Sequence, residues 1–420
     1  MHTFKCTDIQ LNSSPLRILI VVNVFRPDLG GGVLFADLCD GLHERGLNIH
    51  VKCAYPYYPE WSDKSGKNGL KISHETDLGY VVERHGLFIP RNPNSLIQRL
   101  IYEGSFFLSL LRKIPRKNTY DAILVFNPLI GAAAYAGVAS FLSKTPVWLN
   151  VQDLSAQAAA AGGIAGRSKG TSVLERIQNA VFRRSSFWSS ISTPMVDTLK
   201  QIPGAPSDVH LIPNWLHSSL AKHILEASSR KRNTLHSPVK LFYSGNVGGK
   251  QNLLAFCEML KETDASFSFR IQGAGSRFDE VTSWMKHHQD PRFEVHGLSD
   301  EKNLAIALAE ADFFVITEKP GAGNSFVPSK LIPSLASRTP VLALCDPKGP
   351  LGQEMEEFGL GCRLDWNAEG AISAFFSNLD STQLASWQSN CASRSSFYTR
   401  EQGIDRCVQA LTTLSTKSKS

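Results

Sequence analysis

Short apolar runs alternate with longer segments of helical periodicity along the whole chain. Uninterrupted runs of Val, Ile, Leu and Phe are typical of strands buried on both faces of a parallel sheet. The runs of the first half predict strands at Arg17–Val24, Asn48–Ala54, Gly79–His85, Ala122–Phe126, Val147–Val151, Phe187–Ile191 and Val209–Ile212. Those of the second half predict strands at Val239–Ser244, Ser268–Gln272, Phe293–His296, Phe313–Ile316, Val341–Leu344 and Gly361–Leu364. The helical segments between them predict repeated βαβ units.

The length of 420 residues exceeds what one hydrophobic core usually supports, so we expect two domains. Residues 226–238 are polar, end in Pro238 and precede a strong apolar run, which predicts a linker there. The expected architecture is α/β, with doubly wound Rossmann-like domains at residues 1–225 and 239–420. The last helical stretch, Thr399–Leu414, follows the final predicted strand, and its packing on either domain stays open.

The net charge of +6 is too small to indicate a nucleic-acid partner. The charge is uneven, however, because residues 84–117 carry seven Arg or Lys side chains and one acid, Glu103. Interleaved with large apolar residues, this stretch fits a helix on an anionic membrane surface. The favoured interpretation is a helix that packs on its own domain and exposes a basic face.

Eight cysteines are scattered without metal-ligand or redox spacing, which fits small core residues in a reducing cytosol. Residues 1–15 lack the apolar centre of a signal peptide, and no run of about eighteen apolar residues occurs. We therefore expect a cytoplasmic protein, with a peripheral position at the inner face of the cell membrane as the alternative that the basic stretch raises.

Glycine-rich loops follow predicted strands in both halves. In the first half Gly30, Gly31 and Gly32 lead into an apolar helix, and such a loop either approaches a ligand closely or is a plain turn. In the second half the segment 241–253 runs from a strand into glycines and Lys250 at a helix start, where backbone N–H groups attract anions. Lys330 lies in a similar position within the segment 326–344, so two phosphate-facing loops are expected in one domain.

The turn at residues 271–281 contains Gly273 and Gly275, but Phe278 stands where a dinucleotide fingerprint has its third glycine. Hydride transfer is therefore not expected. Tyr57 and Tyr58 lie between two prolines, and Trp61 follows the second; the three either stack on acceptor sugar rings or form a rigid packed loop.

The order of these motifs resembles the large retaining glycosyltransferase family four, of the two-Rossmann-domain GT-B type. Within that family the chain is most similar to bacterial colanic-acid and exopolysaccharide biosynthesis glycosyltransferases. The resemblance rests on the glycine loop after Pro27 and on AYPYYPEW (54–61), WLNVQDL (148–154), IPNW (212–215), YSGNVGGKQNL (243–253), QGAGS (272–276), PSKL (328–331) and LASRTPV (335–341).

The resemblance implies a role for each matching position. Lys250 and Lys330 would hold the donor diphosphate, with Ser329 beside it. Further implied donor contacts are Gly31, Gly32, Asn214, Ser244, Gly245, Asn246, Gly273 and Glu318. Asp153 would lie near the sugar, although Gln152 stands where the family often has histidine. Ser325 and Pro333 occupy the positions of the wider family's two glutamates, and Glu318 is the nearest substitute.

The expected function is transfer of a sugar from a nucleotide diphosphate donor to a saccharide acceptor, lipid-linked, in cell-surface polysaccharide synthesis, with retention. No D-x-D motif is visible, so neither a metal nor another cofactor is expected. Two alternatives remain open: a nucleotide-sugar 2-epimerase, and a non-catalytic scaffold that binds nucleotide-sugar.

Overall fold

The computed structural model describes residues 14–93, 95–153, 179, 181–321 and 329–417. Every strand predicted from the apolar runs is present, with ends shifted by at most three residues. One further strand, β3 (Ser73–Glu75), pairs antiparallel with β4 (Val81–His85). Its three residues carry no apolar run, which is why the pattern did not reveal it.

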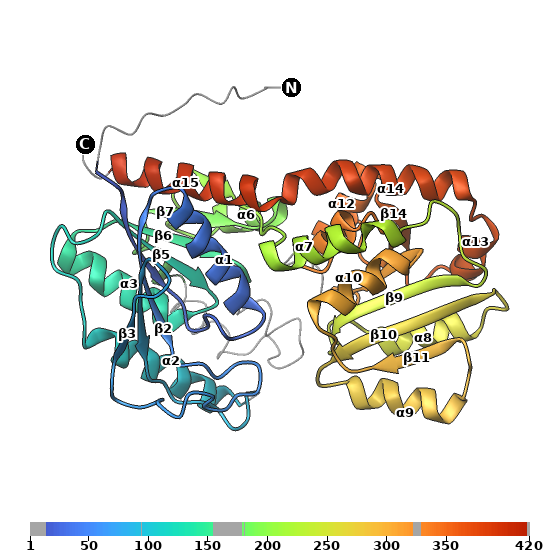
Figure 1. Cartoon of the computed structure of the whole chain (residues 1–420), viewed down its shortest axis with the longest axis horizontal. Helices are drawn as coiled ribbons and strands as arrows, with labels where there is room; N and C mark the ends of the chain where they lie inside the picture. The colour runs from blue at the N-terminus through green and yellow to red at the C-terminus, as the bar shows by residue number, and fades with distance from the viewer. Residues whose placement is uncertain (1–13, 94, 154–178, 180, 322–328, 418–420) are drawn as a thin grey trace. The chain divides into compact units, whose positions relative to one another are not determined.

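The first sheet has eight strands in the order β3-β4-β2-β1-β5-β6-β7-β8. Helices α2 and α3 contact each other on one side of its first strands, and α1 lies on the other side (Figure 1). The remaining elements in chain order are β1 (Arg17–Val21), α1 (Gly31–Glu44), β2 (Asn48–Ala54), α2 (Leu96–Leu111), β5 (Ala122–Asn127), α3 (Ile130–Ser143), β6 (Val147–Val151), β7 (Phe187–Ser190), α6 (Thr193–Lys200) and β8 (Val209–Leu211).

The second sheet has six strands in the order β11-β10-β9-β12-β13-β14, and the pairings between neighbours are all parallel. The elements are α7 (Ser218–Ala227), η1 (Ser228–Arg230), β9 (Val239–Asn246), α8 (Leu253–Lys261), β10 (Phe267–Ala274), α9 (Phe278–His288), β11 (Phe293–His296), α10 (Glu301–Glu310), β12 (Phe313–Thr317), α11 (Leu331–Ala336), β13 (Val341–Leu344), α12 (Pro350–Phe358), β14 (Gly361–Leu364), α13 (Ala371–Ser377), α14 (Ser381–Ser395), η3 (Ser396–Tyr398) and α15 (Arg400–Lys417) (Figure 1).

Side chains that alternate along the second sheet bury both of its faces. Leu241 and Tyr243 on β9 pack in one core with Phe256 of α8. Phe242 between them packs in the opposite core with Leu308 of α10. Because helices cover both faces, the central strands β12 and β13 are buried at every position and almost wholly apolar, and this is what the sequence pattern detected.

In each sheet, consecutive strands of the chain are added first on one side of a central strand and then on the other side. In the second sheet the chain adds β10 and β11 on one side of β9 and then crosses to β12 on the other. In the first sheet it adds β2 and β4 on one side of β1 and then crosses to β5. In open parallel sheets, ligands bind at the carboxyl ends of the strands that flank such a switch point. The glycine loops after β1 and β9 both lie there.

The chain divides into two compact units. The first comprises Met1–Asn150, Val181–Phe187 and Arg406–Ser420, and the second comprises Val151–Ala180 and Trp188–Asp405. The end of α15 is thus grouped with the first unit. Among the described helices none is long and apolar enough to cross a membrane.

Candidate donor site

The loop after β9 is tightly folded around its glycines. Gly245 has φ 122°, a conformation that L side chains rarely adopt. The side-chain oxygen of Gln251 accepts hydrogen bonds from the backbone N–H of Gly248 at 3.1 Å and from the Asn246 amide at 3.4 Å. These two hydrogen bonds fix the loop at the carboxyl end of β9, which is the strand at the switch point of the sheet.

Lys330 reaches this loop from the start of α11. Its Nζ donates a hydrogen bond of 2.7 Å to the Tyr243 hydroxyl, which in turn donates to the carbonyl of Asn246 at 2.5 Å. A Cβ atom on Gly245 would lie only 2.7 Å from Lys330 Cε, so a side chain there would displace the lysine. The sequence predicted Gly245 and Lys330 at one site, and the structure brings them into contact. Tyr243 was overlooked because a buried tyrosine on a strand has the pattern of a core residue.

The surroundings of Lys330 are unusual for a partly buried cation. Burial lowers the pKa of its ammonium group to about 7. Its described partners are the hydroxyl and the ring of Tyr243, whose centroid lies 4.0 Å from Nζ. Within the described part of the chain no carboxylate lies within 4.0 Å of it. A buried ammonium group without a counter-ion is costly, and an anionic ligand would supply the missing charge.

Lys250 and Glu318 follow β9 and β12, the two strands of the switch point. The Lys319 N–H donates to the Lys250 carbonyl at 2.7 Å, and the Thr317 hydroxyl donates to the Gln251 carbonyl at 2.5 Å. These bonds tie the backbone that carries Lys250 to the backbone around Glu318. The predicted lysine and glutamate therefore come from adjacent segments.

Glu318 is a second buried ionisable group at this edge. Its side chain is 5% exposed, and neither carboxylate oxygen has a hydrogen-bond partner in the described part of the chain. Burial, together with the charge of Asp346, raises the pKa of Glu318 to about 7. The indole of Trp366 fixes its backbone by donating to the Glu318 carbonyl at 2.8 Å. Strongly shifted, unsatisfied ionisable groups of this kind are typical of ligand sites.

The turn after β10 adds a residue that the sequence analysis did not single out. Gly273 pairs with Gly245 across β9 and β10, and a Cβ atom on Gly273 would meet the Gly245 carbonyl at 2.5 Å. The Arg277 Nε lies 3.7 Å from the place of a Cβ on Gly249. Arg277 thus brings a half-exposed guanidinium to the glycine loop. Ser329, predicted beside the phosphates, is exposed next to Lys330.

Asp153 and Asn214 form a separate pair of predicted positions. The Asn214 side-chain amide donates to the Gln152 side-chain oxygen at 2.7 Å, so Asn214 lies against the residue that precedes Asp153. Trp215 is buried, and it packs closely on Gly403, where a Cβ would lie 2.4 Å from the indole. The motif residues Leu154, Ser325 and Pro328 lie outside the described residues.

In the first unit, Gly31 and Gly32 form the first turn of α1. A Cβ on Gly32 would lie 3.2 Å from Cβ of Asp28, so the loop folds back closely on itself. Asp28 is buried, and its Oδ1 accepts hydrogen bonds of 3.0 Å from the N–H groups of both Tyr57 and Tyr58. One carboxylate therefore couples the glycine loop to the aromatic loop.

The aromatic loop itself is largely packed. Tyr57 is 1% exposed, and its hydroxyl lies 2.5 Å from that of Tyr102. Trp61 and Tyr58 are partly exposed, with ring centroids 5.8 Å apart, and the Arg99 guanidinium lies 5.7 Å from the Trp61 ring. Of the three predicted acceptor contacts, Tyr58 and Trp61 are partly accessible to solvent, whereas Tyr57 is buried and its ring packs near that of Trp61.

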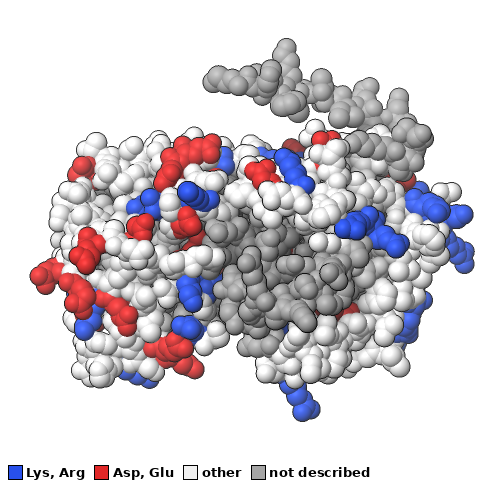
Figure 2. Space-filling model, turned by 180° about the vertical axis from the view of Figure 1, so that it is seen from behind, with Lys and Arg blue, Asp and Glu red and all other residues white. Residues whose placement is uncertain are grey.

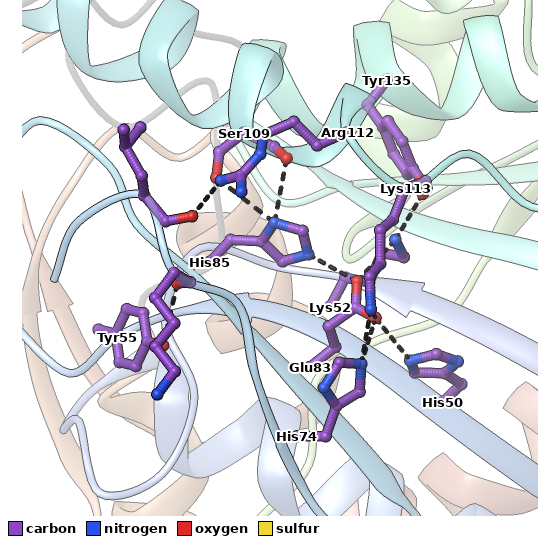
Figure 3. Close-up of polar contacts among 12 residues, drawn as sticks. His50, Lys52, Tyr55, His74, Glu83, His85, Ser109, Arg112, Lys113 and Tyr135 are labelled. Carbon is purple, nitrogen blue, oxygen red and sulfur yellow. Dashed lines mark hydrogen bonds and ion pairs between the residues drawn. The ribbon is translucent and has the colours of Figure 1, made fainter. Parts of the chain in front are cut away.

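A different polar cluster lies between β2, β4 and the end of α2 (Figure 3). Glu83 is buried at its centre, with Lys52 Nζ at 2.8 Å and His85 Nε2 at 2.7 Å from Oε1. His74 and Lys113 lie at 3.0 Å and 3.5 Å from Oε2. Burial raises the pKa of Glu83, but the His85 hydrogen bond and the Lys52 charge outweigh it and hold the pKa well below its usual range. We call this group the Glu83 cluster.

The architecture defines the fold class. Two largely parallel sheets, each with a glycine loop at its switch point, make up the GT-B fold of glycosyltransferases. A sucrose-phosphate synthase from Thermosynechococcus elongatus has the same fold, with a TM-score of 0.67, 13% identity and coverage of 96% of this chain and 100% of that one. The Anabaena protein Alr3699/HepE, solved in complex with UDP and glucose, aligns with a TM-score of 0.65, 14% identity and coverage of 95% and 100%.

Sequence comparison narrows the class. Residues 30–215 match the family model of the glycosyl transferase 4-like domain. A relative in Escherichia coli K12, the "Putative colanic acid biosynthesis glycosyl transferase WcaI", is 26% identical over 358 residues, which cover 82% of this chain and 86% of the relative. By these similarities the chain is a glycosyltransferase, and its structure has the GT-B fold.

Proposed function

We propose that this chain transfers a sugar from a nucleotide diphosphate-sugar to a lipid-linked saccharide, with retention of anomeric configuration, during assembly of a cell-surface polysaccharide. The observation that carries the donor assignment is the partly buried ammonium group of Lys330 against Gly245, without a carboxylate partner in the described residues. The names of two similar proteins add support, since one is solved with UDP and glucose and the other refers to colanic acid biosynthesis.

The donor diphosphate would lie over the glycine loop. Lys330 and Lys250 would neutralise its charge, Arg277 would reach it from the rim, and loop N–H groups would contribute further dipoles. No group of three or more His, Cys, Asp or Glu side chains in the described ranges is placed to hold a metal ion. That the lysines and dipoles suffice without a metal stays a prediction, which activity in the presence of EDTA would test.

The reaction breaks the bond between the anomeric carbon and the β-phosphate oxygen. The electron pair of that bond moves to the diphosphate, and the acceptor hydroxyl oxygen bonds to the same face of the sugar. The departing phosphate oxygen takes the hydroxyl proton, so a separate protein base is not required. Fixed cations stabilise the charge as it develops on the leaving group, and such a contact contributes about 10²–10³ in rate.

Glu318 would accept a hydrogen bond from a donor hydroxyl, which would supply the partner that its carboxylate lacks. Asp153 and Asn214 would bound the sugar, and Gly31 and Gly32 would add contacts to the diphosphate. Tyr58 and Trp61 would stack on acceptor rings. The seven cysteines of the described part are all free thiols, which agrees with a cytoplasmic site of action.

A thermal-shift panel of UDP, GDP, ADP and their sugar conjugates tests the donor assignment, because a ligand stabilises the fold in proportion to occupancy. We expect one nucleotide class to raise Tm in the wild type and to lose this effect in Lys330→Ala but not in Lys302→Ala, an exposed lysine on α10. Full nucleotide response in Lys330→Ala would contradict the donor site.

Product analysis then separates the possible activities. We expect a glycoside with the donor's anomeric configuration, observed by NMR coupling constants, only when an acceptor is present. Conversion of the donor into its 2-epimer without acceptor would identify an epimerase instead. Nucleotide binding with neither sugar transfer nor slow hydrolysis of the donor would identify a non-catalytic scaffold.

A further inference from the structure

Helix α2 is apolar on two opposite sides. Tyr102, Phe106 and Leu110 are buried against the first unit. The outward side carries five large apolar side chains that are 47–70% exposed: Leu96, Ile97, Leu100, Ile101 and Leu108. At 100° per residue these five cover one continuous side of the helix. A surface helix usually exposes polar residues there, so this outward side is a candidate contact surface.

Neighbouring loops extend the same surface. The Arg112 guanidinium donates a hydrogen bond to the Leu70 carbonyl, so the loop with Leu70 lies beside the end of α2. Leu70 itself is 84% exposed. Ser105 Oγ accepts a hydrogen bond of 2.8 Å from the N–H of Phe88, which places that exposed ring beside the middle of the helix. We call the outward side of α2, with Leu70 and Phe88, the α2 surface.

Basic residues surround the α2 surface. The exposed cations before and after the helix are Arg91, Arg112, Arg116 and Lys117, whereas Arg99 lies near the Trp61 ring and Lys113 belongs to the Glu83 cluster. The single acid of residues 84–117, Glu103, is turned inward, where its carboxylate accepts a hydrogen bond of 2.8 Å from the Gly131 N–H at the start of α3. On the face drawn in Figure 2, the part that carries the first unit shows mainly Lys and Arg, whereas acidic side chains gather over the second.

The Glu83 cluster holds the end of α2 rigidly (Figure 3). Lys52 Nζ donates to the Lys113 carbonyl at 2.7 Å, and the Tyr135 hydroxyl donates to the same oxygen at 2.9 Å. His85 Nδ1 lies 3.2 Å from the Ser109 carbonyl. The carbonyl groups of Ser109 in the last turn and of Lys113 just beyond the helix therefore meet side chains of β2, β4 and α3, and these contacts fix the end of the helix that carries the exposed apolar side chains.

We propose that the α2 surface docks on a bilayer that contains anionic lipids. An apolar helix side flanked by cations and free of exposed carboxylates fits the boundary between anionic headgroups and acyl chains. The five apolar side chains enter the boundary, and the cations meet the headgroup phosphates. The inference deepens the proposed function, because a lipid-linked acceptor lies in the same interface. The argument for membrane docking depends only on the exposed residues of the α2 surface, however, and its test needs no nucleotide-sugar.

Co-sedimentation of the full chain with vesicles tests the proposal. We expect the wild type to bind phosphatidylglycerol–phosphatidylcholine vesicles, to bind pure phosphatidylcholine at least tenfold more weakly, and to be released by high salt. The triple variant Ile97→Ser/Leu100→Ser/Leu108→Ser should lose at least tenfold in partition. The triple variant Arg91→Gln/Arg116→Gln/Lys117→Gln should lose a similar factor on anionic vesicles alone.

The matched control is Leu225→Ser/Leu298→Ser, which removes two equally exposed leucines from the second unit and should bind as the wild type does. An unchanged Tm and an unchanged nucleotide response in every variant show that the fold and the donor site are intact. Wild-type protein that stays in the supernatant with anionic vesicles would overturn the proposal. So would a dimer in sedimentation velocity that the serine variant dissolves, because the surface would then join two copies of the chain.

Discussion

Charged groups that are buried or partly buried in the two units differ in how they are neutralised. In the first unit, Glu83 has Lys52, His85, His74 and Lys113 within 3.5 Å. In the second unit, the Lys330 ammonium group donates a hydrogen bond to the phenol of Tyr243. The carboxylate oxygens of Glu318 have no hydrogen-bond partner in the described residues. Pairing offsets the cost of burying a charge, so the Glu83 cluster is neutralised within the protein, whereas an anionic ligand at Lys330 is what the proposed function supplies.

The comparison distinguishes charged groups that stabilise the fold from charged groups that are placed to bind a ligand. The Glu83 cluster fixes the end of α2, and its removal should damage the fold without touching the donor. Removing the charge of Lys330 or Glu318 should instead weaken donor binding and leave the free protein as stable or more stable, because residues placed for a ligand often reduce the stability of the free protein. Four variants test this difference, and they follow from the largest expected effect to the smallest.

Glu83→Gln should destabilise the protein by about 3–5 kcal/mol, because it leaves the ammonium group of Lys52 buried without its counter-ion. Thermal unfolding of the free protein measures this, and Glu83→Gln/Lys52→Met should recover part of the loss. Because the folded-state pKa of Glu83 is depressed, its contribution is present above the unfolded pKa and is lost as pH falls through the folded value. A Tm within one degree of wild type would show that the cluster is not structural.

Lys330→Met should lower transfer by about 10²–10³, equivalent to about 3–4 kcal/mol of lost transition-state stabilisation, and should not destabilise the free protein. The folded-state pKa of Lys330 is lowered to about 7, so its burial penalty is full below pH 7 and fades as pH rises toward the unfolded value. The variant should therefore melt higher than wild type at pH 6.

Nucleotide binding by the wild type should weaken as pH rises above 7, because free Lys330 loses its proton there. Titration calorimetry in buffers of different ionisation enthalpy should detect proton uptake on binding. A pH-independent affinity would argue that Lys330 does not meet the diphosphate.

Glu318→Gln should raise the free energy of unfolding at pH 8 by on the order of 2–3 kcal/mol, since it removes a buried, unpaired carboxylate. At pH 5 the wild-type group is neutral, because its raised pKa is about 7, and the two proteins should then melt alike. The same variant should bind the nucleotide-sugar less tightly. Destabilisation at pH 8 would mean that the carboxylate is satisfied and belongs with Glu83 rather than with Lys330.

Arg277→Ala should have the smallest effect, a three- to fivefold loss of nucleotide affinity, because its guanidinium is half exposed and screened by solvent. Stability should stay within about 0.5 kcal/mol of wild type. Arg270→Ala, which removes an exposed guanidinium from β10, is the matched control and should leave affinity unchanged. Equal losses in both variants would indicate general electrostatic attraction rather than contact at the glycine loop.

The sequence by itself determined the architecture. Strands buried on both faces must be apolar throughout, and helices between them must return the chain to the same sheet, so both sheets were readable without coordinates. The sequence also marked Gly245, Lys250 and Lys330, because an anion at a helix start calls for glycine and lysine. It did not reveal β3, whose pairing depends on β4 and not on its own composition.

Only the tertiary structure decided which charges are paired. Lys52 and Glu83 stand on different strands, and nothing in their local sequence tells that they meet, whereas Glu318 gives no local sign that its oxygens are left without partners. The same holds for α2: its apolar residues are evident in the sequence, but which side faces the core depends on what packs against it. Burial and pairing arise between segments distant in the chain, so the chemistry they create becomes visible only when those segments are placed in space.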